Sequence, residues 1–199
     1  DIMIPFIVDK FHEMGFCRVW DPDKVVLIYD HLVPSSQLDD IRHYKVGDEF
    51  AAKYGIEHVH RSDGICHQLM TEAGYVKPGD VVFGTDSHTT TYGCVGAFST
   101  GIGYTEMAAI LGTGTLWVKV PETIRIHISG TLPANVMSKD MILRIIGDLG
   151  ADGATYRALE FTGDTVERMS VSSRMTMANM AIEAGAKCAL FAPDEKTAQ

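Results

Sequence analysis

Residues capable of chemistry gather in one short stretch, from Gly84 to Gly93, whose sequence is GTDSHTTTYG. It follows the apolar run Val81–Phe83, which predicts a buried strand that ends in a polar loop. Ligands of open α/β sheets bind at the carboxyl ends of the strands. The competing structural interpretation is a turn in which Asp86 and Ser87 cap a helix. We interpret three consecutive residues of this loop as candidate site residues: Asp86, Ser87 and His88.

Two further histidines occupy similar positions. Asp30 and His31 follow the apolar run Val25–Tyr29, and His67 lies just after the strand-like stretch Ile56–Val59. A carboxylate beside an imidazole favours the charged ring, which can then donate a proton near neutral pH. An isolated histidine is more often structural, but three of them after successive strands favour acid–base chemistry.

Strands and helices must alternate to position these loops. The apolar periodicity predicts a layered αβα fold with a mainly parallel sheet. We expect a first α/β lobe over residues 1–124, which carries the three histidine motifs, and the start of a second lobe over 125–199. The predicted helices cover residues 4–14, 37–54, 66–73, 105–111, 138–149 (capped by Ser138) and 172–184. The predicted strands cover residues 25–29, 56–59, 81–83, 116–120, 123–129, 158–161 and 187–191.

The last predicted helix carries two polar residues among methionines. Asn179 and Glu183 are four residues apart, so they share one face of that helix. They form either a solvent-exposed stripe or a pair of polar groups in a pocket. The methionines around them are typical of core packing.

The bulk properties exclude several classes of function. The 199 residues are 46% apolar, which is enough to bury a core, and the formal charge of −9 argues against a nucleic-acid or anionic-membrane surface. The four cysteines form no C-x-x-C motif, which favours free thiols and a cytoplasmic protein. No apolar run is long enough to span a membrane. Because the chain begins at Asp1 in a helix-like pattern, we expect that its true N-terminus is missing.

Four segments, taken in order, resemble the aconitase superfamily. They are Asp30-His31, Gly64-x-x-His67-Gln68, Gly84-Thr-Asp-Ser-His-Thr89 and Asn179-Met-Ala-x-x-Glu183. The stretches Trp20–His31 and Ser173–Asn179 resemble in particular the large subunit of the 3-isopropylmalate dehydratase and homoaconitase branch, in its N-terminal half. The resemblance runs along essentially the whole chain, and four motifs in order are far more specific than any one of them.

The resemblance implies a function and a role for each residue. Members of this family dehydrate or isomerise 2-hydroxy di- and tricarboxylic acids, with a [4Fe-4S] cluster as Lewis acid, and the 3-isopropylmalate dehydratase branch belongs to leucine biosynthesis. The implied pairs are Asp30 with His31, Asp86 with His67, and Glu183 with His88. The implied catalytic residues are Asp30, His31, His67, Asp86, His88 and Glu183, and the implied substrate-binding residues are Ser87 and Asn179.

The chain also departs from the family pattern. The cysteine motifs that hold the cluster do not occur, so we expect no metal ligand in this chain and no cluster bound to it alone. The serine base and the arginines that bind substrate carboxylates belong to a later domain or to a small swivel-domain subunit. We therefore expect a large-subunit fragment that is inactive alone and whose partners are the rest of the large subunit and the small subunit.

Two alternatives from other classes stay open. A mononuclear or dinuclear metal-dependent hydrolase could use Asp30, His31, Asp86 and His88 as ligands, and would bind its metal without an iron–sulfur cluster. A non-catalytic assembly module would tolerate loss of His88. The choice among citrate, isopropylmalate, homocitrate and dimethylmalate is also left open by the sequence.

Overall fold

The structure is a computed structural model that describes residues 3–198, and the chain divides into two compact units. Unit 1 contains the residues up to Leu69 and residues 102–118, and unit 2 contains residues 70–101 and those from Lys119 onward. Each strand pairing in the described residues is parallel, within two two-stranded sheets and one three-stranded sheet. The predicted α/β class with mainly parallel strands is confirmed.

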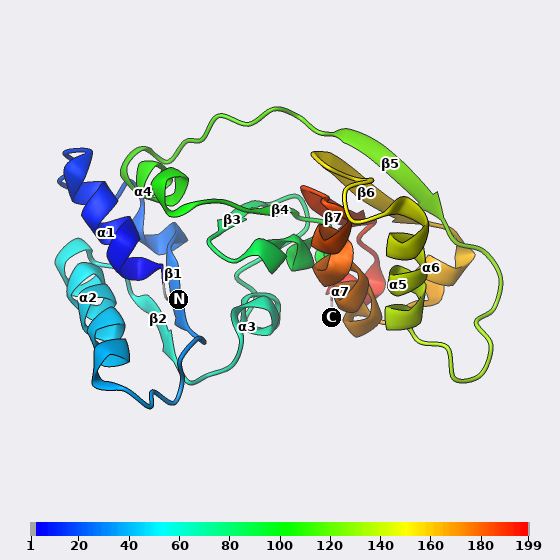
Figure 1. Cartoon of the computed structure of the whole chain (residues 1–199), viewed down its shortest axis with the longest axis horizontal. Helices are drawn as coiled ribbons and strands as arrows, with labels where there is room; N and C mark the ends of the chain where they lie inside the picture. The colour runs from blue at the N-terminus through cyan, green and yellow to red at the C-terminus, as the bar shows by residue number, and fades with distance from the viewer. Residues whose placement is uncertain (1–2, 199) are drawn as a thin grey trace. The chain divides into compact units, whose positions relative to one another are not determined.

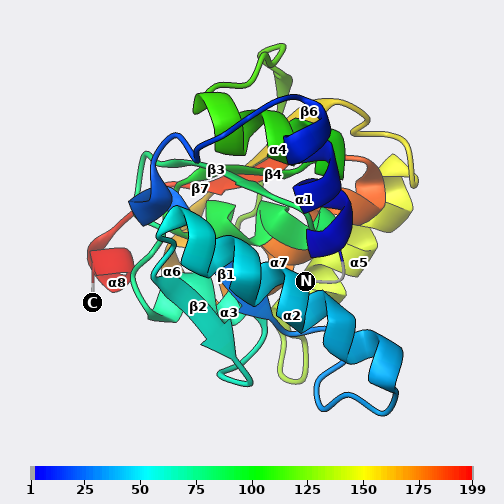
Figure 2. The ribbon, with the colours of Figure 1, turned by 90° about the vertical axis from the view of Figure 1, so that its left-hand side faces the viewer.

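Unit 1 is built on a parallel pair of strands. Helix α1 packs against both α2 and α4, as Figure 2 shows. Phe11 is fully buried in the core of this unit, together with Ile7, Phe50 and Leu111. Its elements are α1 (Ile4–Glu13), the 3₁₀ turn η1 (Pro22–Lys24), β1 (Val26–Tyr29), α2 (Leu38–Tyr54), β2 (His58–Arg61) and α4 (Tyr104–Thr113), and α3 (Cys66–Glu72) begins in it.

The carboxyl end of β1 is fixed by α2. Tyr29, the last residue of β1, is buried, and its hydroxyl donates to a carboxylate oxygen of Asp48 at 3.0 Å. Burial, and then this hydrogen bond, raise the pKa of Tyr29 far above its usual value. Gly47 of α2 lies so close that a Cβ there would overlap the Tyr29 hydroxyl. The backbone is therefore held firmly just before Asp30.

Unit 2 combines the other two sheets. Helices α5 and α7 pack side by side, and β5, β6 and β7 run in parallel in that order (Figure 1). Its core includes Ile142, Leu159, Phe161, Met177 and Phe191. Its elements are β3 (Val81–Gly84), the 3₁₀ helix η2 (Ser87–Val95), β4 (Phe98–Gly101), β5 (Glu122–His127), α5 (Ser138–Leu149), β6 (Arg157–Thr162), α6 (Asp164–Arg168), α7 (Val171–Met180), η3 (Ala181–Ala184), β7 (Cys188–Phe191) and α8 (Glu195–Ala198).

The segment after β3, predicted as a polar loop, is a buried 3₁₀ helix. Every residue of η2 from Thr89 to Val95 is buried. Gly93 of η2 lies directly against β7, since a Cβ at this position would overlap the backbone carbonyl oxygen of Ala189. Backbone contact at Gly93 therefore holds η2, and the residues at its start, against the three-stranded sheet.

Helix α7 is tied to the end of β7 by a buried arginine. Arg174 is 1% exposed, and its Nη2 donates to the carboxylate of Asp194. The hydrogen bond from Arg174 is the main reason that the pKa of Asp194 lies well below its usual value. The guanidinium is therefore committed to an internal ion pair.

Several sequence-based element predictions need correction. The strand predicted at 116–120 is wrong: residues 115–121 form neither helix nor strand, and Trp117 and Val120 are more than four-fifths exposed. The predicted cap by Ser138 is also wrong, because Ser138 is the first helical residue and the carboxylate of Asp140 accepts the N–H of Met137 at 2.8 Å. Strand β2 lies two residues later than predicted, and β4 was not predicted.

The two compact units do not coincide with the predicted lobes. Residues 70–101 group with the C-terminal elements because η2 packs on α7 and β7. The lobe boundary after residue 124 stays a prediction. Among residues 3–198, no helix combines the length and the apolar character needed to cross a membrane.

Replacing Gly93 tests the backbone contact between η2 and β7. We expect Gly93→Ala to lower the free energy of unfolding by about 3 kcal/mol, because the new methyl group meets a backbone atom that cannot rotate away. The matched control is Gly147→Ala on the exposed side of α5, where a Cβ meets no atom within 4 Å. This control should gain about 0.5–1 kcal/mol from helix propensity. Urea unfolding measures both, and equal stability of the two variants would contradict the contact.

Candidate functional site

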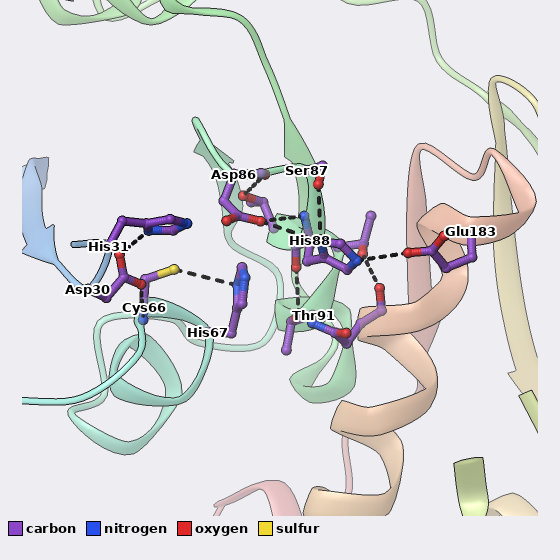
Figure 3. Close-up of polar contacts among 12 residues, drawn as sticks. Asp30, His31, Cys66, His67, Asp86, Ser87, His88, Thr91 and Glu183 are labelled. Atoms are coloured by element: carbon purple, nitrogen blue, oxygen red, sulfur yellow. Dashed lines mark hydrogen bonds and ion pairs between the residues drawn. The ribbon is translucent and has the colours of Figure 1, made fainter. Parts of the chain in front are cut away.

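In unit 1, one buried carboxylate connects two of the predicted site segments. Asp30 Oδ1 lies 2.8 Å from His31 Nδ1, and Asp30 Oδ2 accepts the backbone N–H of Cys66 at 2.7 Å (Figure 3). The parallel register pairs Tyr29 with Arg61, so the segments after β1 and β2 leave from the same edge of the sheet. This register brings the start of α3 to Asp30.

The contacts of Asp30 keep its side chain ionised. Burial, with the carboxylate 5% exposed, raises the pKa of Asp30, but hydrogen bonds from the thiol and backbone of Cys66 and from His31 lower it more. The net pKa lies below the usual value of an aspartate. A negative charge therefore stands beside the His31 ring, which is 43% exposed.

His67 lies on the first turn of α3, next to Cys66. Its Nδ1 is 3.7 Å from the Cys66 sulfur. The bond from the Cys66 N–H to Asp30 therefore positions the turn that carries His67. Asp86, the carboxylate predicted to pair with His67, belongs to unit 2, and this pairing stays a prediction.

In unit 2, Asp86 caps a helix, as the structural interpretation of the sequence predicted, and it also faces an imidazole. Its Oδ1 accepts the backbone N–H of His88 at 2.7 Å, which caps η2, and lies 3.6 Å from His88 Nδ1. Ser87 does not cap the helix, because its hydroxyl lies 3.0 Å from His88 Nδ1. The Asp86 carboxylate thus both caps η2 and places a charge beside the His88 ring.

The other side of the His88 ring faces Glu183. His88 Nε2 and Glu183 Oε1 are 3.0 Å apart, although the residues are 95 positions apart in the chain (Figure 3). Because a carboxylate only accepts, Nε2 carries the hydrogen, and Nδ1 is left to the Ser87 hydroxyl. Glu183 lies on η3, directly after α7, with its side chain 53% exposed. The pair can hold and exchange a proton with a ligand.

Asn179 contacts η2 rather than standing apart on its helix. Its amide nitrogen donates to Thr91 Oγ1 at 2.9 Å, and the Thr91 hydroxyl lies 2.6 Å from the backbone oxygen of His88. The hydroxyl of Thr90 donates to the backbone oxygen of Asn179 at 3.3 Å. Sequence reasoning missed Thr90 and Thr91, although a run of three threonines after the histidine was a visible signal.

Comparison with protein families gives a match over the whole chain. The model of the aconitase family (aconitate hydratase) matches residues 1–199. The chain belongs to the aconitase family.

Curated relatives in this family are about half identical to the chain. It is 52% identical over 198 residues to the 3-isopropylmalate dehydratase large subunit 1 of Methanopyrus kandleri, covering 99% of this chain and 47% of the relative. It is 50% identical over 184 residues to the probable methanogen homoaconitase large subunit of Methanothermobacter thermautotrophicus, covering 92% of this chain and 43% of the relative. The chain therefore spans about half the length of the curated relatives it matches.

The cysteines of the chain can be tested against the [4Fe-4S] cluster that aconitase-family enzymes carry. Burial raises the pKa of the Cys94 and Cys188 thiols to about 12 and about 11, which disfavours the thiolates that iron binds. Only Cys17 and Cys66 remain, and the N–H and thiol of Cys66 are already directed at Asp30. The four cysteines of this chain therefore do not fit the cluster. It stays a prediction that the cluster ligands lie outside this chain.

Because Asp30 bonds both the Cys66 N–H and the His31 ring, we predict that the stability of the folded chain depends on pH. The pKa of Asp30 is lower in the folded chain than in the unfolded one, so its ionisation favours folding. This contribution is complete above the ordinary aspartate pKa of about 4 and is lost as the pH falls through the folded-state value. Asp30→Ala should cost about 2 kcal/mol at pH 7, since it leaves the Cys66 N–H without its acceptor, and less at pH 3.

Urea unfolding at pH 7 and pH 3 provides the measurement. Asp63→Ala is the control, because Asp63 also contacts a histidine, His60 at 2.8 Å, but is half exposed. It should change stability by less than about 1 kcal/mol at either pH. A loss from Asp30→Ala that does not depend on pH would contradict the assigned ionisation.

Proposed function

We propose that this chain is part of the large subunit of a hydro-lyase that dehydrates or isomerises a 2-hydroxy di- or tricarboxylic acid, as a 3-isopropylmalate dehydratase does. The observation that carries the proposal is the His88–Glu183 pair at 3.0 Å, on a chain that belongs to the aconitase family. The names of the relatives, 3-isopropylmalate dehydratase and homoaconitase large subunits, support the substrate class.

The chemistry of the two carboxylate–imidazole pairs suits the removal of water. A hydroxyl group leaves carbon more readily when its oxygen receives a proton as the bond breaks. The carboxylates of Asp30 and Glu183 each accept from one ring nitrogen, which fixes the orientation of His31 and His88. We assign these two imidazoles to proton transfer with the substrate hydroxyl, and the Ser87 hydroxyl, 3.0 Å from His88 Nδ1, to substrate contact.

We propose that other parts of the complete enzyme bind the substrate carboxylates and supply the base. Within the described residues, five arginines already face a carboxylate of the chain: Arg61, Arg144, Arg157, Arg168 and Arg174. The rest of the large subunit and a small subunit are therefore the proposed partners, and the word "large" in the names of the relatives supports a second subunit. The chain alone should have no activity.

The two alternative functions have less support. A metal-dependent hydrolase and an assembly module are each possible for a set of histidine loops, but family membership over the whole chain favours a hydro-lyase. Isopropylmalate, homocitrate, citrate and dimethylmalate are the substrates to compare.

The proposal is tested by turnover of the full-length large subunit, assembled with its small subunit after anaerobic iron–sulfur loading, on these four acids. We expect one of them to be converted, and His88→Asn and Glu183→Gln each to lower kcat by about 10²- to 10⁴-fold, the usual size of an acid–base contribution. The control is His12→Asn, because His12 is exposed on α1 and contacts Tyr54 at 3.2 Å.

Each result has a direct meaning. Conversion of one acid together with a loss confined to His88→Asn and Glu183→Gln supports the hydro-lyase. Full activity of His88→Asn would support the assembly module, and a metal bound by the chain without iron–sulfur absorbance in the complete enzyme would support the hydrolase.

A further inference from the structure

We infer that Thr91 is a positioning residue, which acts on the reaction by fixing the backbone of His88, and that Asn179 acts through Thr91. The inference rests on the proposed function, since it concerns how the same site is held. Three hydrogen bonds of unit 2 carry it: two join α7 to η2, and the third links Thr91 to the His88 backbone within η2.

The first step is the geometry of Thr91. This residue is fully buried in η2, and its hydroxyl lies 2.6 Å from the backbone oxygen of His88. The hydroxyl oxygen of Thr91 in turn accepts the amide N–H of Asn179 at 2.9 Å. A threonine hydroxyl has one hydrogen, so donating to His88 while accepting from Asn179 is the arrangement that satisfies both bonds.

The second step is that one short segment holds His88 at two points. Asn179 lies near the end of α7, and Glu183 follows four residues later on η3. Asn179 reaches the His88 backbone through Thr91, and Glu183 reaches the His88 ring directly at 3.0 Å. Fixing the backbone and the ring from the same segment sets the distance between His88 Nε2 and Glu183 Oε1.

The third step is a second bond between Asn179 and η2, which keeps α7 and η2 from shifting relative to each other. The Thr90 hydroxyl donates to the backbone oxygen of Asn179 at 3.3 Å, so Asn179 is bonded to η2 through its side chain and its main chain. Thr90 is also fully buried. One N–H of the Asn179 amide is therefore engaged inside the unit, and we assign the contribution of Asn179 to turnover to this bond with Thr91.

Thr91→Val removes the hydroxyl but keeps the shape of the side chain. In the assembled, cluster-loaded enzyme we expect kcat to fall by about 10- to 100-fold, as for other groups that orient a catalytic residue, with KM changed less than about twofold. Thr91→Ser, which restores the hydroxyl, should recover most of the activity. The matched control is Thr176→Val in α7, where the lost hydroxyl donates to the backbone oxygen of Ser172 at 3.1 Å.

A double-mutant cycle separates positioning from a general loss of structure. If Thr91 acts by setting the His88–Glu183 distance, Thr91→Val should cost less than about threefold in kcat once Glu183→Gln is present. Asn179→Ala should likewise cost little in the Thr91→Val background, because its acceptor is already gone. Equal, multiplicative losses in both backgrounds would overturn the inference.

The outcomes also distinguish this inference from the proposed function. Loss of activity in Glu183→Gln with full activity in Thr91→Val would leave the hydro-lyase standing and overturn the role of Thr91. Full activity in Glu183→Gln would overturn the proposed function itself. Circular dichroism and the urea midpoint of Thr91→Val identify a folding defect, and in that case Asn179→Ala, measured with and without Glu183→Gln, decides instead.

Discussion

The arrangement of the site depends on one type of interaction, in which the carboxylate that follows a strand accepts a backbone N–H at the start of a helical element and faces an imidazole. Asp30 binds the N–H of Cys66 and the ring of His31. Asp86 binds the N–H of His88 and faces the ring of the same residue. An anionic acceptor is favoured at a helix start by the unpaired N–H groups there. The same charge orients the imidazole, so a local folding requirement also positions the group to which we assign proton transfer.

Glycine makes this arrangement possible around Asp86. Gly101, the last residue of β4, lies beside the loop, and a Cβ there would come within 2.7 Å of the Asp86 backbone oxygen and 3.0 Å of Ser87 Cα. Gly84, which ends β3, lies against the Thr89 side chain in the same way. The Thr89 hydroxyl donates back to the Asp86 backbone oxygen at 2.6 Å. A larger side chain at either strand end would therefore displace the carboxylate from the start of η2.

The sequence was most informative where apolar periodicity and glycine act together. Helix α2 was predicted within one residue because its apolar side chains repeat at helical spacing and Gly55 adopts the left-handed conformation that ends it. Strand β4 escaped prediction because its buried residues Ser99 and Thr100 are polar, so no apolar run marks it. The stretch Leu116–Val120 has strand-like residues but no strand beside it to pair with. Local patterns therefore found the elements whose buried side chains are apolar and missed the strand whose buried side chains are polar.

Within the site, local sequence patterns were also insufficient to predict contacts between distant residues. The His88–Glu183 contact followed from a family resemblance, because no local rule relates residues 95 positions apart. Thr91 was missed because its importance lies in the partners of its hydroxyl, not in its type.

Helix α7 shows why such partners matter. Two of its polar residues are bonded inside the unit: Arg174 to Asp194 beyond β7, and Asn179 to Thr91 in η2. Each of these polar groups would cost free energy if buried alone, so each stabilises the unit only while its partner is in place. The helix therefore links the segment after β7 to η2 through bonds that are specific in direction. Apolar packing by methionines fills the space between them but allows small shifts. The hydrogen bonds, rather than the packing, set the position of Glu183 relative to His88.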